Sequence, residues 1–356
     1  MKKLFTLLFF ITMINSVVFA GRGLEIPEYI LVKTGDGKIE EIELDTYLYS
    51  VVQSEMGINY KASGMSSAKS VPLDALKAQA VASRSYAVYN ILKAGEDAEY
   101  HVTSTVTSQV YNKNANIADI VKEAVDETSG QVITYDDEVA CAYFFSTSGG
   151  HTEAPENVWS SAIPYLQGVE DEYEIEVDNK TTWTAVYTQS ELQKLFPKLG
   201  RIEDIVIEDY SENDRVTELK IVGSKGKETL TKNSIRMKMG TGKLRSQWFD
   251  VEFYGDEAVF EGRGFGHGIG MSQNGAIGMA LEGFSYDEIL EWYYTDIEIY
   301  GFDDYSYDYK YDDDKYEEEY YIPEEELEEI ELEKPFLEKT IEICTTNWLL
   351  SFMGNR

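Results

Sequence analysis

Residues 262–276 read GRGFGHGIGMSQNGA and form the most specific segment of the 356-residue chain. Glycine occupies every second position from Gly262 to Gly270, so an extended backbone here would clear one face of side chains. The spacing matches neither the dinucleotide-binding glycine fingerprint nor the phosphate-binding loop. Because ordering five glycines within nine residues costs much conformational entropy, we expect tight packing or a functional contact, with a flexible loop as the simpler alternative.

The rest of the chain mixes helical and strand patterns. Helical spacing of apolar residues is found at 45–56, from Pro72 to Val88, near 117–127 and at 285–294. Short β-rich runs occur at 29–33, 38–44, 103–111, 131–135, 139–145, 205–207 and 218–222. We therefore predict an α+β fold with mixed helices and short, mainly antiparallel strands around a substrate groove.

The charge of the chain is strongly acidic and unevenly placed. Its 31 Lys and Arg face 65 Asp and Glu, a formal net charge of −34, so the basic stripe that nucleic-acid binding requires is lacking. Residues 301–340 alone hold 6 Asp and 11 Glu against 4 Lys. We predict one domain over residues 21–300 and a disordered, acidic, Tyr-rich tail over residues 301–356.

The N-terminus has the pattern of an export signal. Lys2 and Lys3 precede an apolar run, and Val18-Phe19-Ala20 offers the small residues of a cleavage site, which predicts a signal peptide over residues 1–20. An uncleaved membrane anchor is the alternative. Both place the protein on the outer side of the cytoplasmic membrane, either secreted or associated with the wall or membrane. With only Cys141 and Cys344, no disulfide framework is expected, although a single disulfide between these two cysteines is an alternative.

One acidic residue lies on an apolar helix face. Leu44, Leu48, Val51 and Val52 lead along that face to Glu55, in the last turn of the predicted helix. Burial and the helix dipole would both raise the pKa of Glu55, as a general acid near neutral pH requires. The alternative is that the helix frays after Val52 and leaves Glu55 solvated.

Two further segments offer polar groups. Lys77 and Arg84 are seven residues apart and share a helix face, where they could bind carboxylates or a sugar polymer, or simply pair with nearby acids. Residues 146–153, STSGGHTE, follow a strand-like run and suit either a binding loop or an ordinary polar turn. No nucleophile-elbow pattern surrounds these serines, so a serine hydrolase is not indicated.

The sequence does not predict a metal site or a cofactor. The three histidines, His101, His151 and His267, are far apart in the sequence, and no paired His or Cys spacing accompanies them. Convergence of Cys141 with His101 and His151 would be needed to build a site.

Five segments occur along the chain in a fixed order. They are VVQSEM at 51–56, ALKAQAVASRSYA at 75–87, SQVY at 108–111, STSGG at 146–150 and the glycine-rich residues 262–276, with Tyr293 and Tyr294 beyond. Together they resemble the SpoIID/LytB family of bacterial cell-wall proteins over roughly residues 28–300. This resemblance covers nearly all of the predicted domain.

The resemblance implies an activity and a site. Sporulation members of the family are lytic transglycosylases that cleave glycan strands stripped of their stem peptides, and their catalytic glutamate corresponds to Glu55. The same likeness implies a substrate groove lined by Lys77, Arg84, Gln109, Tyr111, Ser146, Ser148, His267 and Gln273. A single acid suffices for such an enzyme, because the glutamate protonates the glycosidic oxygen and then deprotonates the sugar's own 6-hydroxyl, which gives a 1,6-anhydro product.

Two departures from the family pattern bear on this interpretation. Gly57 stands where relatives usually have proline, and residues 60–70 form an insertion beside the proposed acid that could act as a lid. Some relatives bind a metal near the SQVY segment, but this chain has Thr107 and Ser108 there, so the resemblance implies no metal site in this chain. The alternative functions are a non-catalytic wall-binding protein that enhances a cell-wall amidase, and a purely structural surface protein.

Overall fold

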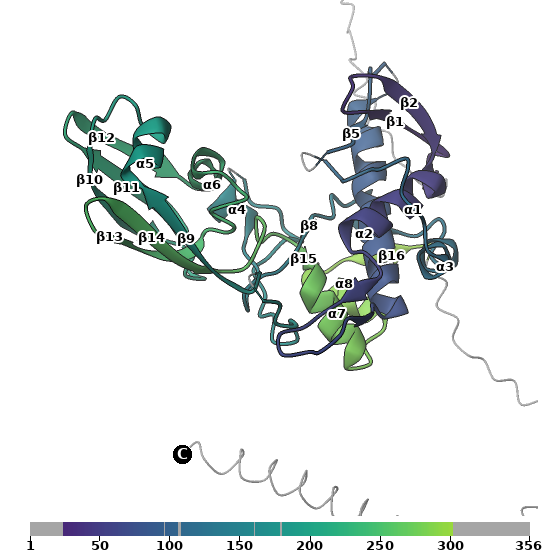
Figure 1. The fold of residues 1–356 in the computed structure, drawn as a ribbon. Coiled ribbons are helices and arrows are strands. Elements are labelled where there is room, and N and C mark those ends of the chain that lie inside the picture. The colour runs from purple at the N-terminus through teal and green to yellow at the C-terminus, as the bar shows by residue number, and fades with distance from the viewer. Residues whose placement is uncertain (1–23, 96, 106–107, 160, 179, 302–356) are drawn as a thin grey trace, which may run out of the picture. The chain divides into compact units, whose positions relative to one another are not determined.

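The computed structural model describes residues 24–301, except residues 96, 106–107, 160 and 179. The predicted signal peptide and the acidic tail beyond Gly301 lie outside the described residues, as does Cys344. The described residues form an α+β fold of eight helices and sixteen strands, most of them short and antiparallel, as predicted (Figure 1). None of the helices described has the length and apolar character needed to cross a membrane.

The first part of the chain is built mainly from helices. Its elements are β1 (Tyr29–Lys33), β2 (Ile39–Glu43), α1 (Leu44–Glu55), β3 (Asn59–Tyr60), β4 (Lys69–Ser70), α2 (Leu73–Ala94), β5 (Val102–Thr103) and α3 (Asp119–Glu127). The Glu43 side chain caps α1 by accepting from the Thr46 N–H at 2.7 Å, and Pro72 is the N-cap of α2. The apolar faces of α1, α2 and α3 share one core that includes Leu48, Val51 and Val125. This core fixes the end of α1, where Glu55 lies.

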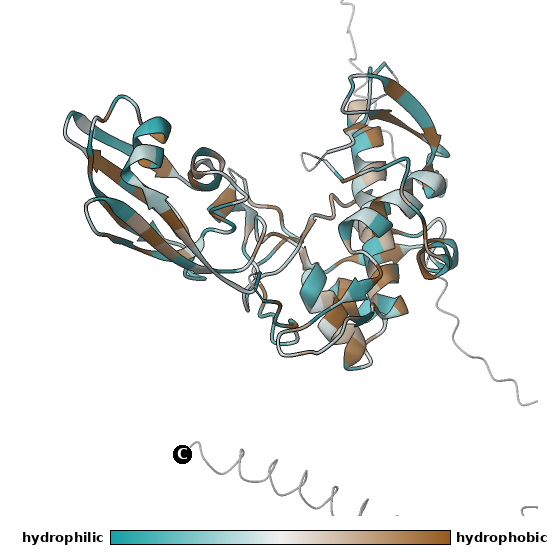
Figure 2. Cartoon of the chain, viewed as in Figure 1, coloured by the Kyte–Doolittle hydropathy of each residue, from teal (hydrophilic) through white to brown (hydrophobic). Residues whose placement is uncertain are grey.

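The later part contains two three-stranded antiparallel sheets, β10-β11-β12 and β13-β14-β9. Its elements are β9 (Thr182–Thr188), α5 (Gln189–Leu195), β10 (Ile202–Tyr210), β11 (Val216–Gly223), β12 (Gly226–Thr231), α6 (Asn233–Met239), β13 (Trp248–Phe253) and β14 (Glu257–Arg263). Exposed and buried residues alternate along β9, and Figure 2 shows hydrophobic and hydrophilic residues alternating along these strands. Each sheet therefore buries one face in an apolar core and leaves the other face polar.

Short strands and helices complete the fold around a third apolar cluster. They are β6 (Val132–Tyr135), β7 (Glu138–Val139), β8 (Phe144–Phe145), α4 (Pro155–Val158), β15 (Met271–Ser272), α7 (Gln273–Leu281), α8 (Tyr286–Tyr293) and β16 (Glu298–Tyr300). The parallel pair β15–β8 joins Met271 to Phe144 and Ser272 to Phe145. This pairing places the start of α7 next to the loop that follows Phe145.

The glycine-rich segment is extended only as far as Arg263, at the end of β14. Its next four glycines, at 264, 266, 268 and 270, have φ values of 79°, 131°, 87° and 74°. A Cβ on Gly264 would lie 2.5 Å from the Ser148 carbonyl oxygen, and one on Gly270 would lie 2.1 Å from that of Tyr143. The expectation of an extended segment is therefore wrong beyond Arg263, whereas the predicted tight packing is confirmed.

Two of the predicted strand runs are broken. Of the run at 103–111, only Thr103 lies in a strand, the two-residue β5, and the run at 139–145 is divided between β7 and β8. Around residue 110 the backbone bonds to side chains instead of a neighbouring strand: the Val110 N–H donates to Glu55 and the Asn112 N–H to Ser50. This loop thereby becomes part of the candidate site.

Candidate functional site

Glu55 is the last residue of α1, and its side chain is half-buried. The helix does not fray after Val52, because the Met56 N–H donates to the Val52 carbonyl at 3.1 Å. The carboxylate accepts a hydrogen bond from the Val110 N–H at 2.6 Å. Glu55 is therefore held in a fixed position against the 108–111 loop rather than solvated at a loose helix end.

The surroundings of Glu55 favour its protonated form. Burial raises the pKa of Glu55 above its ordinary value, and hydrogen bonds from the Val110 backbone and the Gln273 side chain offset part of that rise. Among the described residues, no neighbouring carboxylate contributes to the shift. The geometry thus provides a single carboxylic acid with a raised pKa and two donors that steady its ionised form.

A buried chain of amides connects the groups around Glu55. Gln273 donates to the Gln79 side-chain oxygen at 3.2 Å, and Gln79 donates to the Ser83 hydroxyl at 2.9 Å. Gln109 donates to the Ser83 carbonyl at 3.2 Å and accepts from the Tyr47 hydroxyl at 3.0 Å. Because Gln109 is locked on both sides, the following N–H, that of Val110, is aimed at Glu55.

The nearby loop 146–150 is held by two acids, the buried Asp171 and the half-buried Glu174. Glu174 accepts from the Thr147 hydroxyl, from the Ser148 N–H and, at 2.8 Å, from the Gly149 N–H. Asp171 accepts from the Ser148 hydroxyl at 2.7 Å. Burial raises the pKa of both acids, and the charge of Asp171 raises that of Glu174 further.

The same acids are tied to the helices that follow. The Ser272 hydroxyl, which caps α7, donates to Glu174 at 3.1 Å, and the Tyr293 hydroxyl donates to Asp171 at 2.6 Å. The Asn274 N–H donates to the Ser146 carbonyl at 3.0 Å. Loop 146–150 and the start of α7, which carries Gln273, therefore form one rigid unit.

His267 lies among aromatic rings. Ring centroids of Phe145, Trp159 and Tyr143 are 5.5, 5.4 and 6.2 Å from its imidazole. Its Nδ1 accepts from the Ile269 N–H at 3.1 Å, and burial lowers the pKa of His267 to about 3. The imidazole is therefore neutral at physiological pH and supplies shape and packing rather than positive charge.

Lys77 and Arg84 of α2 do not meet at Glu55. Arg84 is completely buried and donates to the Val125 and Thr128 carbonyls at 3.1 and 2.7 Å, with Asp45 as its ionic partner. Lys77 pairs with Glu127 at 2.6 Å. Arg84 thus joins α1, α2 and α3. The expectation that Arg84 lines a substrate groove is wrong, because α3 covers this face of α2.

Some of the predicted site residues lie around Glu55, and the others have partners elsewhere. Gln273 acts on Glu55 directly, and Gln109 holds the backbone next to Val110, whose N–H donates to Glu55. Tyr111 stacks on Tyr47 with ring centroids 5.3 Å apart. Ser146 joins them through its contact with α7, whereas the Ser148 hydroxyl is used by Asp171.

The chain is similar to known proteins along most of its length. Residues 33–135 match the family model described as stage II sporulation protein (SpoIID). Stage II sporulation protein D of Bacillus subtilis (strain 168) is 34% identical over 291 residues, covering 77% of this chain and 78% of the relative. The chain belongs to the SpoIID family. A second member, from Bacillus amyloliquefaciens, is 32% identical over 301 residues, 80% of this chain and 81% of its own length.

The chain also matches a further relative and a second family model. The Amidase enhancer of Bacillus subtilis (strain 168) is 28% identical over 275 residues, which cover 62% of this chain and 37% of that protein. Residues 169–270, which include the strands β9–β14 of this SpoIID-family chain, match a domain of unknown function (DUF8618).

Sequence reasoning missed several residues of the site. Gln79 and Ser83 lie within the ALKAQAVASRSYA segment, where polar residues inside an otherwise apolar helix were the available signal. Asp171 and Glu174 stand in an acid-rich stretch, and nothing in the sequence separates them from their exposed neighbour Glu172. Among the described residues, no group of three His, Cys, Asp or Glu side chains is arranged to hold a metal ion.

Proposed function

We propose that this SpoIID-family chain is an exported peptidoglycan lytic transglycosylase that cleaves the MurNAc–GlcNAc backbone of glycan strands. The observation that supports this proposal is the half-buried Glu55 carboxyl, with its raised pKa and its two hydrogen-bond donors. Family membership supports a role in sporulation and the cell wall. The signal peptide predicted at residues 1–20 supports its action outside the cytoplasmic membrane.

The chemistry requires one carboxyl group in two protonation states. Protonated Glu55 gives its proton to the glycosidic oxygen as the bond from that oxygen to C1 breaks. The resulting carboxylate removes the proton of the 6-hydroxyl on the same sugar, and that oxygen bonds to C1 to close the 1,6-anhydro ring. No water is consumed, and Glu55 regains its proton. The raised pKa of Glu55 serves the first step, and the Val110 and Gln273 donors steady the carboxylate before the second.

The test is a digest of peptide-free glycan strands, with the ends analysed by mass spectrometry. Wild type should give 1,6-anhydro ends, and Glu55→Gln should lower the rate by about 10²–10⁴-fold, the usual contribution of a general acid. Glu41→Gln, an exposed acid on β2, is the matched control and should keep full activity. Anhydro ends formed by Glu55→Gln at the wild-type rate would refute the assignment.

A second function is favoured by the likeness to the Amidase enhancer. In that case the chain would bind wall material without cleaving it and would raise the rate of a cell-wall amidase. Adding the chain to intact walls together with an N-acetylmuramoyl-L-alanine amidase separates the two proposals. Faster amidase action with no anhydro ends, unchanged in Glu55→Gln, would favour the enhancer.

A further inference from the structure

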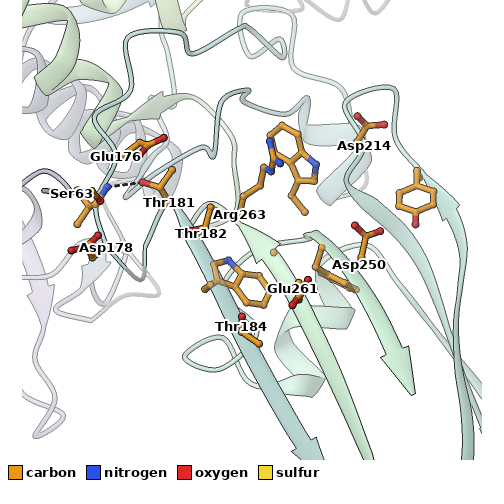
Figure 3. Close-up of a pocket in the computed structure, with 16 residues that line it drawn as sticks. Ser63, Glu176, Asp178, Thr181, Thr182, Thr184, Asp214, Asp250, Glu261 and Arg263 are labelled. Carbon is orange, nitrogen blue, oxygen red and sulfur yellow. Dashed lines mark hydrogen bonds between the residues drawn. The ribbon is translucent and has the colours of Figure 1, made fainter. Parts of the chain in front are cut away.

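A groove of about 1130 Å³ crosses the outer, polar face of the β13-β14-β9 sheet (Figure 3). We call it the outer-face groove; it is lined by residues 63, 176–178, 181–184, 210, 214, 248–250 and 261–263. None of these is Glu55 or a residue that contacts it. The groove is thus a separate feature from the candidate catalytic site.

Strand register builds the floor of the groove from two cross-strand rows. Thr182, Arg263 and Trp248 stand opposite one another on adjacent strands, and so do Thr184, Glu261 and Asp250. Residues two apart on a strand share a face, so the rows lie about 7 Å apart. The floor therefore offers hydroxyls, carboxylates, the Arg263 guanidinium and the Trp248 indole in two rows; Figure 3 labels Thr182, Thr184, Asp250, Glu261 and Arg263.

Loops from other parts of the chain wall this floor. Glu176 and Asp178 lie just before β9, and Asp214 lies between β10 and β11. Ser63, in the connection between β3 and β4, reaches the groove and donates its N–H to the Glu176 carbonyl at 2.7 Å. The 60–70 insertion that follows Glu55 in the sequence thus contributes to this groove.

The groove favours a cationic occupant. Its five carboxylates, those of Glu176, Asp178, Asp214, Asp250 and Glu261, are all exposed, and none forms an ion pair with a described Lys or Arg. Its one cation, Arg263, lies over the Trp248 ring at 4.9 Å. Unpaired carboxylates accept hydrogen bonds from ammonium and hydroxyl groups but cannot donate any.

The groove suits a sugar polymer better than an extended peptide. A peptide that adds to a sheet needs free backbone N–H and C=O groups at a strand edge. The floor is instead the face of three strands whose ladders are already paired with each other. A ligand on this face can be contacted only by side chains, namely hydroxyls, carboxylates, rings and the Arg263 guanidinium, and these match the hydroxyl and amino groups of a sugar.

We propose that the outer-face groove binds wall glycan whose amino sugars carry free, non-acetylated amino groups. This proposal rests on the proposed function, which makes wall glycan the substrate. Fully N-acetylated strands have no ammonium group, and their lactyl carboxylates would be repelled by the groove. Each free 2-amino group adds one ammonium to pair with a carboxylate of the floor. The groove thereby selects the non-acetylated stretches of a strand.

The test is calorimetric titration of the full chain with a hexamer of β-1,4-linked glucosamine and with the N-acetylglucosamine hexamer. The glucosamine hexamer should bind at least about tenfold more tightly, and the double variant Asp250→Asn/Glu261→Gln should lose about that factor. Glu257→Gln, an exposed acid on β14 outside the groove, is the control and should bind like wild type. Melting curves of each variant show that it is folded.

Three outcomes would overturn the proposal. The first is equal affinity for the two hexamers, and the second is an equal loss of glucosamine-hexamer affinity in the Glu257→Gln control. The third is a lysine-rich peptide that binds more tightly than the glucosamine hexamer and whose binding the double variant abolishes. Thr184→Val removes a hydroxyl but no charge, and it should weaken glucosamine binding without affecting the peptide. These titrations involve no cleavage, so absence of anhydro ends with wild type would refute the proposed function while leaving the glucosamine result standing.

Discussion

The helical region (α1–α3, α7 and the 108–111 loop) and the sheet region (β9–β14 with α5 and α6) use polar side chains differently. In the helical region, Gln79, Ser83, Arg84 and Gln109 are completely buried and hydrogen-bonded inside the protein. The sheet region keeps an apolar core on one face and places most of its charges on the other.

This difference separates two kinds of site. A buried polar network holds one acid in one geometry, and removing a member leaves its partners without hydrogen bonds. A polar sheet face instead offers solvated groups that can bind a ligand and can be replaced at little cost to folding. Substitutions in the helical region should therefore cost stability and activity, whereas those on the sheet face should change binding.

Replacing Arg84 by methionine should have the largest effect on stability. The variant leaves the Val125 and Thr128 carbonyls without their buried donor, and we expect a loss of about 3–5 kcal/mol in the free energy of unfolding. Chemical denaturation measures this. Arg201→Met breaks an exposed ion pair with Asp256 and should cost at most about 1 kcal/mol. Similar losses for the two variants would contradict the distinction between the regions.

Glu174→Gln should have the next largest effect, because an amide NH₂ would replace one of the two oxygens that accept hydrogen bonds from loop 146–150. We expect a loss of about 2 kcal/mol in the free energy of unfolding. Since burial raises the pKa of Glu174, its contribution to wild-type stability is present at low pH and is lost as pH rises through that raised value. The variant should lack this part of the pH dependence, whereas the exposed neighbour Glu172→Gln should keep it.

Gln273→Leu tests how the network tunes Glu55. The Gln273 hydrogen bond lowers the pKa of Glu55, so its removal should raise that pKa and move the alkaline limb of the pH–rate profile to higher pH. The rate at the optimum should fall roughly tenfold, because the carboxylate needed for the second step loses a donor. Gln167→Leu, an exposed glutamine, is the control. A limb that stays in place, or moves to lower pH, would contradict this role.

The sequence predicted the fold class, the helices α1, α2, α3 and α8, and the half-buried position of Glu55, because these depend on periodicity within one element. It missed the helices α4 to α7, which are short or lack a clear apolar face. It did not predict the placement of Arg84, because sharing a helix face with Lys77 does not reveal that α3 covers that face. The bend after Arg263 was also missed, since alternating glycines fit an extended strand as well as a chain pressed against the Ser148 and Tyr143 carbonyls. Each of these errors concerns partners that are distant in the sequence.

The smallest effect is expected from Thr188→Ala in the sheet region. Thr188 caps α5 by accepting from the Glu191 N–H, and the Glu191 side chain bonds back to the Thr188 N–H at 2.8 Å. Losing this cap should cost about 1 kcal/mol in the free energy of unfolding. Ser190→Ala, two residues further along the chain, should cost less free energy of unfolding because Ser190 provides no cap. Both variants should keep wild-type rates of anhydro-end formation, since no residue of α5 contacts Glu55 or lines the outer-face groove. A lower rate in Thr188→Ala alone would show that the sheet region also supports the acid.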